Sequence, residues 1–438
     1  MTNIQNFLKT VAKKYNSMSL ILRIAIGLVI GAILGLVFPH ASWIAEFGNL
    51  FVGALKAIAP ILVFVLVAGA LAQGSSKLDR RFGLVIWLYM LTTFLAAFVA
   101  VLTSFAFPVR VTLTDAADAA VIPQGLGEVF HTLLSNLVNN PFGSLIGGNY
   151  IGILFWACMF GLAMKRIASD SSKLFMANTA DSISLIVRWI IDLAPFGIMG
   201  IVFTNVSENG LAIFTEYGKL LLLLVGTMLL MALVIDPFVA FLYLHRNPYP
   251  LVFKCLKESG VTAFFTRSSA ANIPINMGLC ERLGLDRDMY SVSIPLGATI
   301  NMDGAAVTIT VMSLAACNTL GIQVSFPAAV LLSIVSALGA CGASGVAGGS
   351  LLLIPMACSL FGISNDIAMQ VVGVGFIIGV VQDSVETALN SAGDVVFAAT
   401  AEYHEWLKRG KRLPAFMYSK REREKLGIPD DSTVKSGE

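Results

Sequence analysis

"SIPLGATINMDGAAVTIT", residues 293–310, places Asn301 and Asp303 inside an otherwise apolar run. This stretch contains no basic residue, so the Asp303 carboxylate has no partner close by in the sequence. A carboxylate inside lipid is costly, and where one is found it usually serves a function. The fold and the function both depend on whether this stretch crosses a membrane.

The composition of the 438-residue chain answers that question. Hydrophobic residues make up 56% of the sequence and charged residues only 13%, with a mean hydropathy of +0.80. A soluble protein has about 25% charged residues, so this chain could not cover a water-exposed surface. Its long continuous apolar runs are unlike the alternating ten-residue segments of a membrane β-barrel. The sequence therefore predicts an all-α polytopic membrane protein.

Basic clusters at the ends of the apolar runs indicate how the chain is threaded, because positive residues collect on the cytoplasmic side. Successive spans run alternately toward and away from these clusters, which predicts that both termini are cytoplasmic. The basic N-terminal segment 1–19 lacks a small-residue cleavage site, so we expect no removed signal peptide. The first six spans are predicted at about 20–38, 44–73, 82–107, 141–164, 183–205 and 218–244.

Two later segments do not fit a simple span. Residues 259–280 carry Arg267 and Pro274, and both of their flanks are charged, as if both lay on the same side. Residues 339–350 are too rich in glycine for a stable helix. We predict two re-entrant hairpins, entered from opposite sides and each followed by a span, as in an inverted repeat with a midplane binding site. The hairpins and the eighth span are predicted at about 250–281, 325–361 and 367–400.

Polar side chains at membrane depth occur in the third span, the first hairpin, and the seventh and eighth spans. In the eighth span they recur at steps of three or four, so they share one helix face. The acids, among them Asp303, Asp383 and Asp394, outnumber the basic residues at that depth, where the sequence offers Arg267. Small hard cations bound by carboxylates, amides and main-chain carbonyls would supply the missing positive charge.

Three motifs together resemble a known family. They are "TRSS" at 266–269, "PLGATINMDG" at 295–304 and the polar face of the eighth span. They resemble the dicarboxylate/amino acid:cation symporters, the glutamate transporter family, and the likeness follows the whole chain in element order. It implies a homotrimer whose transport domain moves like an elevator against a scaffold. The scaffold would comprise 20–73 and 127–205, the transport domain 82–107 and 218–412, and a polar tail 413–438.

The resemblance also implies a binding site. Asp383 would bind a substrate amino group, Thr387 and Asn390 its α-carboxylate, and Ser269 and the main chain near Val346 would close over it. The implied coupling ion is Na⁺, at two or three sites. One site would use Gly297, Asn301, Asn390 and Asp394. A second would use Tyr89, Thr92, Thr93, Asn301 and Asp303. A third would use Thr299, Met302, Ala340, Cys341 and Ala343.

Two departures from the acidic-substrate pattern concern substrate choice. Members that carry acidic substrates have an arginine three residues after the amino-binding aspartate, where this chain has Glu386, and a threonine where it has Ala305. A buried Glu386 would repel a substrate carboxylate. The resemblance thus implies sodium-coupled import of small neutral hydroxy amino acids, L-serine and L-threonine, across a bacterial inner membrane. Glu386 would either accept the substrate hydroxyl or be neutralised by Arg267.

Other functions have weaker support. A proton- or sodium-coupled carrier of dicarboxylates or acidic amino acids predicts a basic residue at position 386. An intramembrane hydrolase needs a base, but the four histidines lie in loops or at span ends, and neither G-x-S-x-G nor H-E-x-x-H occurs. Two occluding hairpins disfavour a passive channel, and we expect neither an enzyme nor a nucleic-acid partner. The six cysteines have no metal or redox spacing and are interpreted as core residues.

Overall fold

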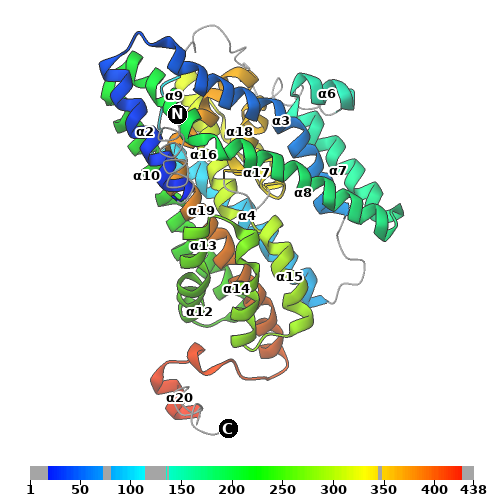
Figure 1. Cartoon of the computed structure of the whole chain (residues 1–438). Helices are drawn as coiled ribbons and strands as arrows, with labels where there is room; N and C mark the ends of the chain where they lie inside the picture. The colour runs from blue at the N-terminus through cyan, green and yellow to red at the C-terminus, as the bar shows by residue number, and fades with distance from the viewer. Residues whose placement is uncertain (1–17, 73–79, 114–134, 136–137, 344–347, 427–438) are drawn as a thin grey trace, which may run out of the picture.

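The computed structural model of the chain describes residues 18–72, 80–113, 135, 138–343 and 348–426. Every regular element in these ranges is a helix (Figure 1). Seven described helices are long and apolar enough to cross a membrane. A further apolar helix, α2 (Leu20–Val37), has 18 residues. The predicted all-α polytopic architecture is confirmed.

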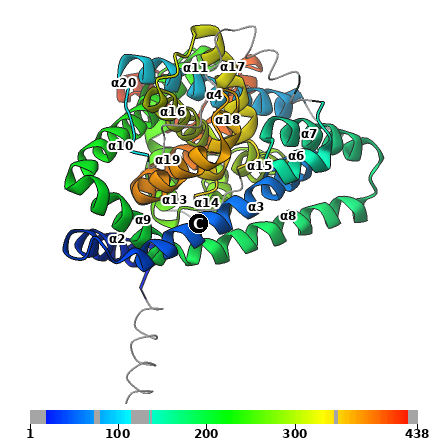
Figure 2. The same ribbon diagram turned by 90° about the horizontal axis from the view of Figure 1, so that it is seen from above.

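One group of helices packs around α3. α3 contacts α7, α8 and α9, and α2 lies along α9. Figure 2 shows α2, α3, α8 and α9 together along one side of the molecule. The bounds beyond α2 are α3 (Ala45–Ala72), α7 (Tyr150–Ile167), α8 (Asp170–Asp192) and α9 (Ala194–Asn209).

The predicted fifth span is wrong as a single helix over 183–205. α8 ends at Asp192, and α9 begins at Ala194 with Pro195 in its first turn. Proline has no amide N–H to donate, so it is tolerated in the first turn of a helix and disfavoured in the interior. The chain therefore starts a new helix at this point.

The predicted fourth span, 141–164, is also divided. A short helix, α6 (Pro141–Gly147), ends at Gly148, whose φ of 64° lies in the left-handed region that favours glycine. Asn149 then caps α7 by accepting a hydrogen bond from the main chain of Gly152.

A second group of helices packs around α19 (Asn365–Lys408), the longest described helix. Figure 2 shows α19 at the centre of the molecule. Its neighbours bring both predicted hairpins, the third span and the seventh span to the same helix. The main neighbours are α4 (Arg80–Ala106), α10 (Ile213–Leu230), α11 (Asp236–Leu244), α15 (Arg287–Ile300) and α16 (Asp303–Leu320), together with the hairpin helices.

Both predicted hairpins are helix pairs joined by a tip. In the first, α12 (Tyr249–Cys255) continues through a π-helical turn into α13 (Val261–Thr266), and the chain returns as α14 (Ser269–Arg282). In the second, α17 (Phe326–Ala340) leads to the tip and α18 (Ile354–Ser359) leads away from it. At 15 residues, α17 is about 22 Å long, too short to cross a hydrocarbon core of about 30 Å.

The quoted stretch 293–310 folds as a broken helix. α15 ends at Ile300 and α16 begins at Asp303, while Asn301 and Met302 have non-helical dihedral angles. Every residue of α16 from Asp303 to Cys317 is buried. The helix is therefore interrupted at the polar residues, and the break lies inside the protein, where main-chain polar groups can be satisfied.

The segment after α19 corrects the prediction of a polar tail from 413 onward. Leu413, Met417 and Tyr418 are buried, and the last two lie where the chain packs near α12. The Arg246 guanidinium lies 4.8 Å from the Tyr418 ring centroid, a cation–π contact. Apolar side chains thus anchor residues 413–418, and residues 427–438 lie outside the described part of the chain.

Candidate functional site

The middle of α19 carries the polar face predicted from the sequence. Asp383, Glu386, Asn390 and Asp394 are all at least 94% buried. The tip of the first hairpin, the second hairpin, α4 and the α15–α16 break all supply partners to this part of α19. Four elements far apart in the sequence therefore meet at one helix.

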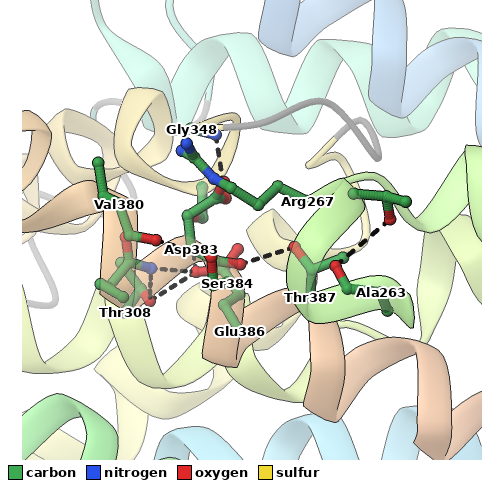
Figure 3. A network of polar contacts seen from close by, with 12 residues as sticks. Ala263, Arg267, Thr308, Gly348, Val380, Asp383, Ser384, Glu386 and Thr387 are labelled. Carbon is green, nitrogen blue, oxygen red and sulfur yellow. Dashed lines mark hydrogen bonds and ion pairs between the residues drawn. The ribbon is translucent and has the colours of Figure 1, made fainter. Parts of the chain in front are cut away.

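Asp383 is held from both hairpins. The Arg267 Nε donates to Asp383 Oδ2 at 2.6 Å, and the main-chain N–H of Gly348 donates to Oδ1 at 3.1 Å. Figure 3 shows Arg267 and Gly348 both reaching Asp383. Both partners of this ion pair are largely buried, with side-chain exposures of 10% and 4%. Loss of one partner of such a buried ion pair strongly destabilises the folded protein, because the other charge is then buried without a partner.

Arg267 has an unusual main-chain conformation. Its φ is 52°, in the left-handed region that a residue with a Cβ rarely adopts. Such strain costs about 1–3 kcal/mol and persists where the surroundings enforce it, typically at ligand-binding positions. The conformation ends α13 and turns the chain toward α14, which brings the guanidinium to α19.

Glu386 lies one turn further along α19 and has its own set of donors. Its Oε2 accepts hydrogen bonds from Thr308 Oγ1 at 2.7 Å, from Ser350 Oγ at 2.9 Å and from Gln382 Nε2. Figure 3 shows Thr308 beside Glu386. Gly304 allows the close packing, because a Cβ there would lie 2.8 Å from the Glu386 Cα. Three donors on one oxygen stabilise a buried carboxylate.

The α15–α16 break forms a second polar cluster with α4. Thr93 Oγ1 donates to Asp303 Oδ1 at 2.9 Å and accepts from the Met302 N–H at 3.2 Å. Thr92 is buried beside it, with its hydroxyl bonded to the main chain of Leu88. Among the described residues, Asp303 Oδ2 is buried without a hydrogen-bond partner.

Asn301 and Asp394 form a third cluster. Asn301 Nδ2 donates to Asp394 Oδ1 at 3.1 Å and to the Asn390 carbonyl at 3.2 Å. Tyr89 Oη donates to the Asp394 carbonyl at 2.9 Å. Gly297 is required here, because a Cβ would lie 2.7 Å from Asp394 Oδ1. Within the described ranges, Asn301 Oδ1 and Asp394 Oδ2 are buried without partners.

These unpaired oxygens indicate what the site can bind. A buried acceptor without a partner costs about 1–3 kcal/mol, and more if it is charged. Carboxylate, amide and hydroxyl oxygens are ligands for hard cations. Three His, Cys, Asp or Glu side chains do not converge anywhere in the described ranges, unlike the ligands of a structural zinc ion. The unpaired oxygens are thus of the kind that hard cations take as ligands.

A small cavity adjoins Asp383. Phe376 and Val380 of α19 line it, together with Arg267 of the first hairpin and Gly348 of the second. Ile191 and its neighbours Ile24 and Ala194 close it from α8, α2 and α9. The Asp383 carboxylate thus lies at the boundary between the two helix groups.

Comparison with known proteins identifies the family. The model of the sodium:dicarboxylate symporter family matches residues 20–403. The chain belongs to this symporter family. The family resemblance drawn from the motifs is confirmed, and family membership indicates a transporter rather than an enzyme.

Named relatives of this symporter are bacterial. A protein of Bifidobacterium adolescentis is 73% identical over 98% of this chain and all of its own length. Proteins of Streptococcus agalactiae and Streptococcus thermophilus are 59% and 58% identical over 90% and 92% of this chain, and 98% and 100% of their own lengths. All three relatives bear the name serine/threonine transporter SstT.

Most predicted site residues of the symporter meet around α19, but some have other surroundings. Thr299 is exposed, and its hydroxyl donates to the Leu296 carbonyl of its own helix. The Thr387 hydroxyl likewise donates to the main chain of Asp383. Ser269 is buried at the start of α14. Val346 lies outside the described residues.

The predicted residues of the second hairpin lie near the α15–α16 break. The Cys341 thiol donates to the Ile300 carbonyl at 3.5 Å. Ala340 and Ala343 are buried, and the Ala340 carbonyl accepts the Ala343 N–H at 2.8 Å. Met302 approaches from the α15–α16 break, where its sulfur accepts a hydrogen bond from Asn390. The elements of the third predicted cation site are therefore adjacent, although the Thr299 hydroxyl points elsewhere.

Sequence reasoning missed three polar residues of the symporter. Thr308 and Ser350 bind Glu386, but an isolated hydroxyl in an apolar run is commonly a helix–helix contact. Asp236 is a buried acid in the predicted sixth span. Its signal was available, because a carboxylate inside an apolar run is costly wherever it occurs.

Proposed function

We propose that this symporter imports L-serine and L-threonine together with Na⁺. The names of the relatives support the substrates, and the family description supports the ion. The structural observation that carries the proposal is Glu386, a buried acid close to Asp383 with three donors on one oxygen. A substrate with a carboxylate side chain would meet an acid where it needs a base, which disfavours the dicarboxylate alternative.

In this proposal Asp383 binds the substrate amino group. In the structure, Arg267 pairs with that carboxylate. The substrate ammonium group would therefore share the Asp383 carboxylate with the Arg267 guanidinium. Asn390 Nδ2, whose partner is the weak acceptor Met302 sulfur, is the group best able to turn to the α-carboxylate, assisted by Thr387. Ser269 and the second tip, near Val346, close over the ligand. Arg267 is bound to Asp383 and so does not neutralise Glu386. The Glu386 carboxylate therefore accepts the hydroxyl of the substrate side chain.

Na⁺ is cargo in this scheme, and the buried oxygens are its proposed ligands. Asn301, Asp303 and Asp394 each have an oxygen without a partner in the described structure, which supports the first two sites. The first site joins Gly297, Asn301, Asn390 and Asp394. The second joins Tyr89, Thr92, Thr93, Asn301 and Asp303. A third would use Met302, Ala340, Cys341 and Ala343, with Thr299 contributing through its main chain.

Coupling follows from the shared use of α19. Na⁺ neutralises the acids that otherwise repel each other, and it orders the backbone that closes over the substrate. By linkage, substrate then raises Na⁺ affinity by the same factor. Each net charge that moves inward gains about 2.3 kcal/mol per 100 mV of membrane potential. We place the protein in the bacterial inner membrane, as a homotrimer with cytoplasmic termini.

Uptake of labelled L-serine into proteoliposomes tests the function. We expect accumulation only with an inward Na⁺ gradient, and inhibition by excess L-threonine but not by L-aspartate. Equal Na⁺ on both sides is the control, and it should abolish accumulation above equilibrium. Uptake of aspartate, or accumulation driven by a proton gradient without Na⁺, would contradict the proposal.

The elevator movement makes a separate prediction at the boundary between the helix groups. Lys56 of α3 forms an ion pair with Asp366 at the start of α19, and both side chains are at least 42% exposed. If α19 moves past α3, this pair must separate in each transport cycle. Joining Lys56→Cys to Asp366→Cys with a flexible bifunctional thiol reagent that contains a disulfide should therefore stop uptake, and reductive cleavage of that disulfide should restore it.

The two single substitutions, Lys56→Cys alone and Asp366→Cys alone, are the controls for that crosslink. An exposed ion pair contributes about 0–1 kcal/mol, so each single variant should keep uptake within about threefold of the original protein, treated or not. Full uptake by the crosslinked double variant would show that α19 does not move past α3 during transport.

A further inference from the structure

Asp236 is a buried acid for which the proposed mechanism has no role. It begins α11, immediately after the π-helical turn Met231–Ile235, and is 4% exposed. Its Oδ1 is buried and has no hydrogen-bond partner among the described residues. A carboxylate in this position requires a compensating positive charge or a donor, because burial in a membrane protein removes the water that would otherwise solvate it.

Helix capping does not explain Asp236. A capping aspartate accepts a hydrogen bond from an N–H in the first turn of the helix that follows it. Asp236 has helical dihedral angles itself, no side-chain cap is present at the start of α11, and the next residue, Pro237, has no N–H. Capping, the most common role of an acid at the start of a helix, therefore does not account for Asp236.

A second buried acid makes the burial of Asp236 less favourable. The group whose charge acts on Asp236 is Asp303 of the second proposed Na⁺ site. Asp303 is fully buried, and its Oδ2 also lacks a partner among the described residues. Ion pairs in the described structure involve neither acid. Two buried like charges within electrostatic range of each other call for a cation.

The π-helical turn brings Asp236 toward this site. The turn contacts α4, which carries Thr92 and Thr93, and also contacts α19. A π-helical turn adds a residue to the helix and so rotates the following side chains, and such turns occur often at functional sites. The sixth span therefore packs against helices of the cation site beside its buried acid, Asp236.

We propose that Asp236 is a ligand of the Na⁺ site formed by Thr92, Thr93, Asn301 and Asp303. Its carboxylate supplies a second negative charge and an oxygen, directly or through one water, to the cation held by Asp303. The proposal rests on Na⁺ being the coupling ion. It adds the sixth span to the elements that respond to cation binding, through a residue that the family motifs do not include.

Asp236→Asn tests the proposal because it keeps the shape and removes the charge. We expect the Na⁺ concentration for half-maximal serine uptake to rise at least tenfold, with the serine KM at saturating Na⁺ unchanged within about twofold. A second readout needs no transport: Na⁺ should raise the Tm of the purified protein in detergent, with a midpoint shifted by the same factor in the variant. Asp303→Asn is the positive control and should shift the Na⁺ midpoint by at least as much as Asp236→Asn.

Thr227→Val is the matched control. Thr227 lies on the same span, is 2% exposed, and its hydroxyl pairs with Thr103 at 2.9 Å, away from the proposed site. It should leave the Na⁺ midpoint unchanged in both readouts, so a shift caused by general disturbance of the span would be recognised. A shift in Thr227→Val equal to that in Asp236→Asn would overturn the proposal.

The outcomes separate this proposal from the proposed function. An unchanged Na⁺ midpoint in Asp236→Asn, together with a shifted midpoint in Asp303→Asn, overturns the role of Asp236 alone. If the original protein shows no Na⁺ response in either readout, the proposed function itself fails. Should Asp236→Asn not survive purification, Asp236→Glu decides, because it keeps the charge but moves the oxygens by one methylene. A shifted midpoint supports the role, and an unchanged one overturns it.

Discussion

Asp383→Asn should lower the apparent affinity for L-serine by about 100- to 1000-fold. The substitution removes the charge that the substrate amino group needs, while the amide oxygen can still accept the Gly348 N–H. It also leaves Arg267 buried without its partner, a loss that costs about 3–5 kcal/mol for a buried pair. The measurement is the concentration dependence of Na⁺-driven serine uptake, with serine binding to the purified protein as a check.

A second substitution distinguishes lost binding from lost folding. Asp383→Asn combined with Arg267→Gln removes both charges, so thermal stability in detergent should return toward that of the original protein. Serine binding should not return, because the ammonium group still lacks its carboxylate. Restored serine uptake in the double variant, or uptake within tenfold in Asp383→Asn alone, would show that Asp383 does not bind the amino group.

The sequence predicted the helical fold because the signals for it are local. Apolar runs and basic clusters give the spans, and the glycine-rich segment 339–350 and the charges around 259–280 give the hairpins. The errors fall where one residue interrupts an otherwise continuous run. Pro195 and Gly148 each divide a predicted span, and nothing in the hydropathy pattern distinguishes a helix break from a tolerated residue.

The pairing of site residues was harder to predict because it joins distant segments. Arg267 and Asp383 are 116 residues apart, and the sequence places both at membrane depth without saying that they meet. The donors of Glu386 come from α16 and the second hairpin as well as α19. Asp236 was missed because it stands alone, near the basic end of its span, and the π-helical turn that directs it inward has no sequence signature.

The geometry also explains why substrate and ion sites can influence each other. Asn390 accepts the Gly304 N–H at 2.7 Å through its side chain, and its carbonyl accepts Asn301 Nδ2. The same residue is proposed to bind the substrate α-carboxylate. A ligand that changes the position of Asn390 therefore acts on both sides of the α15–α16 break, which is the physical contact that linkage requires.

Substrate choice should depend on Glu386, and Glu386→Gln is the variant that tests it. A hydrogen bond to a charged group contributes about 1.5–3 kcal/mol, so replacing the carboxylate by an amide should weaken serine binding by about tenfold. L-alanine lacks the hydroxyl, so its affinity should change by no more than about threefold. L-aspartate should become a measurable competitor, because the repulsion of its side chain is removed. The measurement is inhibition of labelled serine uptake by each amino acid.

Thr308→Ser is the control for Glu386→Gln. It keeps a hydroxyl donor for the Glu386 Oε2 and removes only a methyl group, so the ratio of serine to alanine affinity should stay within about twofold. Glu386→Gln should change that ratio, because serine has a hydroxyl that binds the Glu386 carboxylate and alanine has none. If serine and alanine affinities fall by the same factor, Glu386 supports the architecture of the pocket through Thr308, Ser350 and Gln382 and does not contact the substrate side chain.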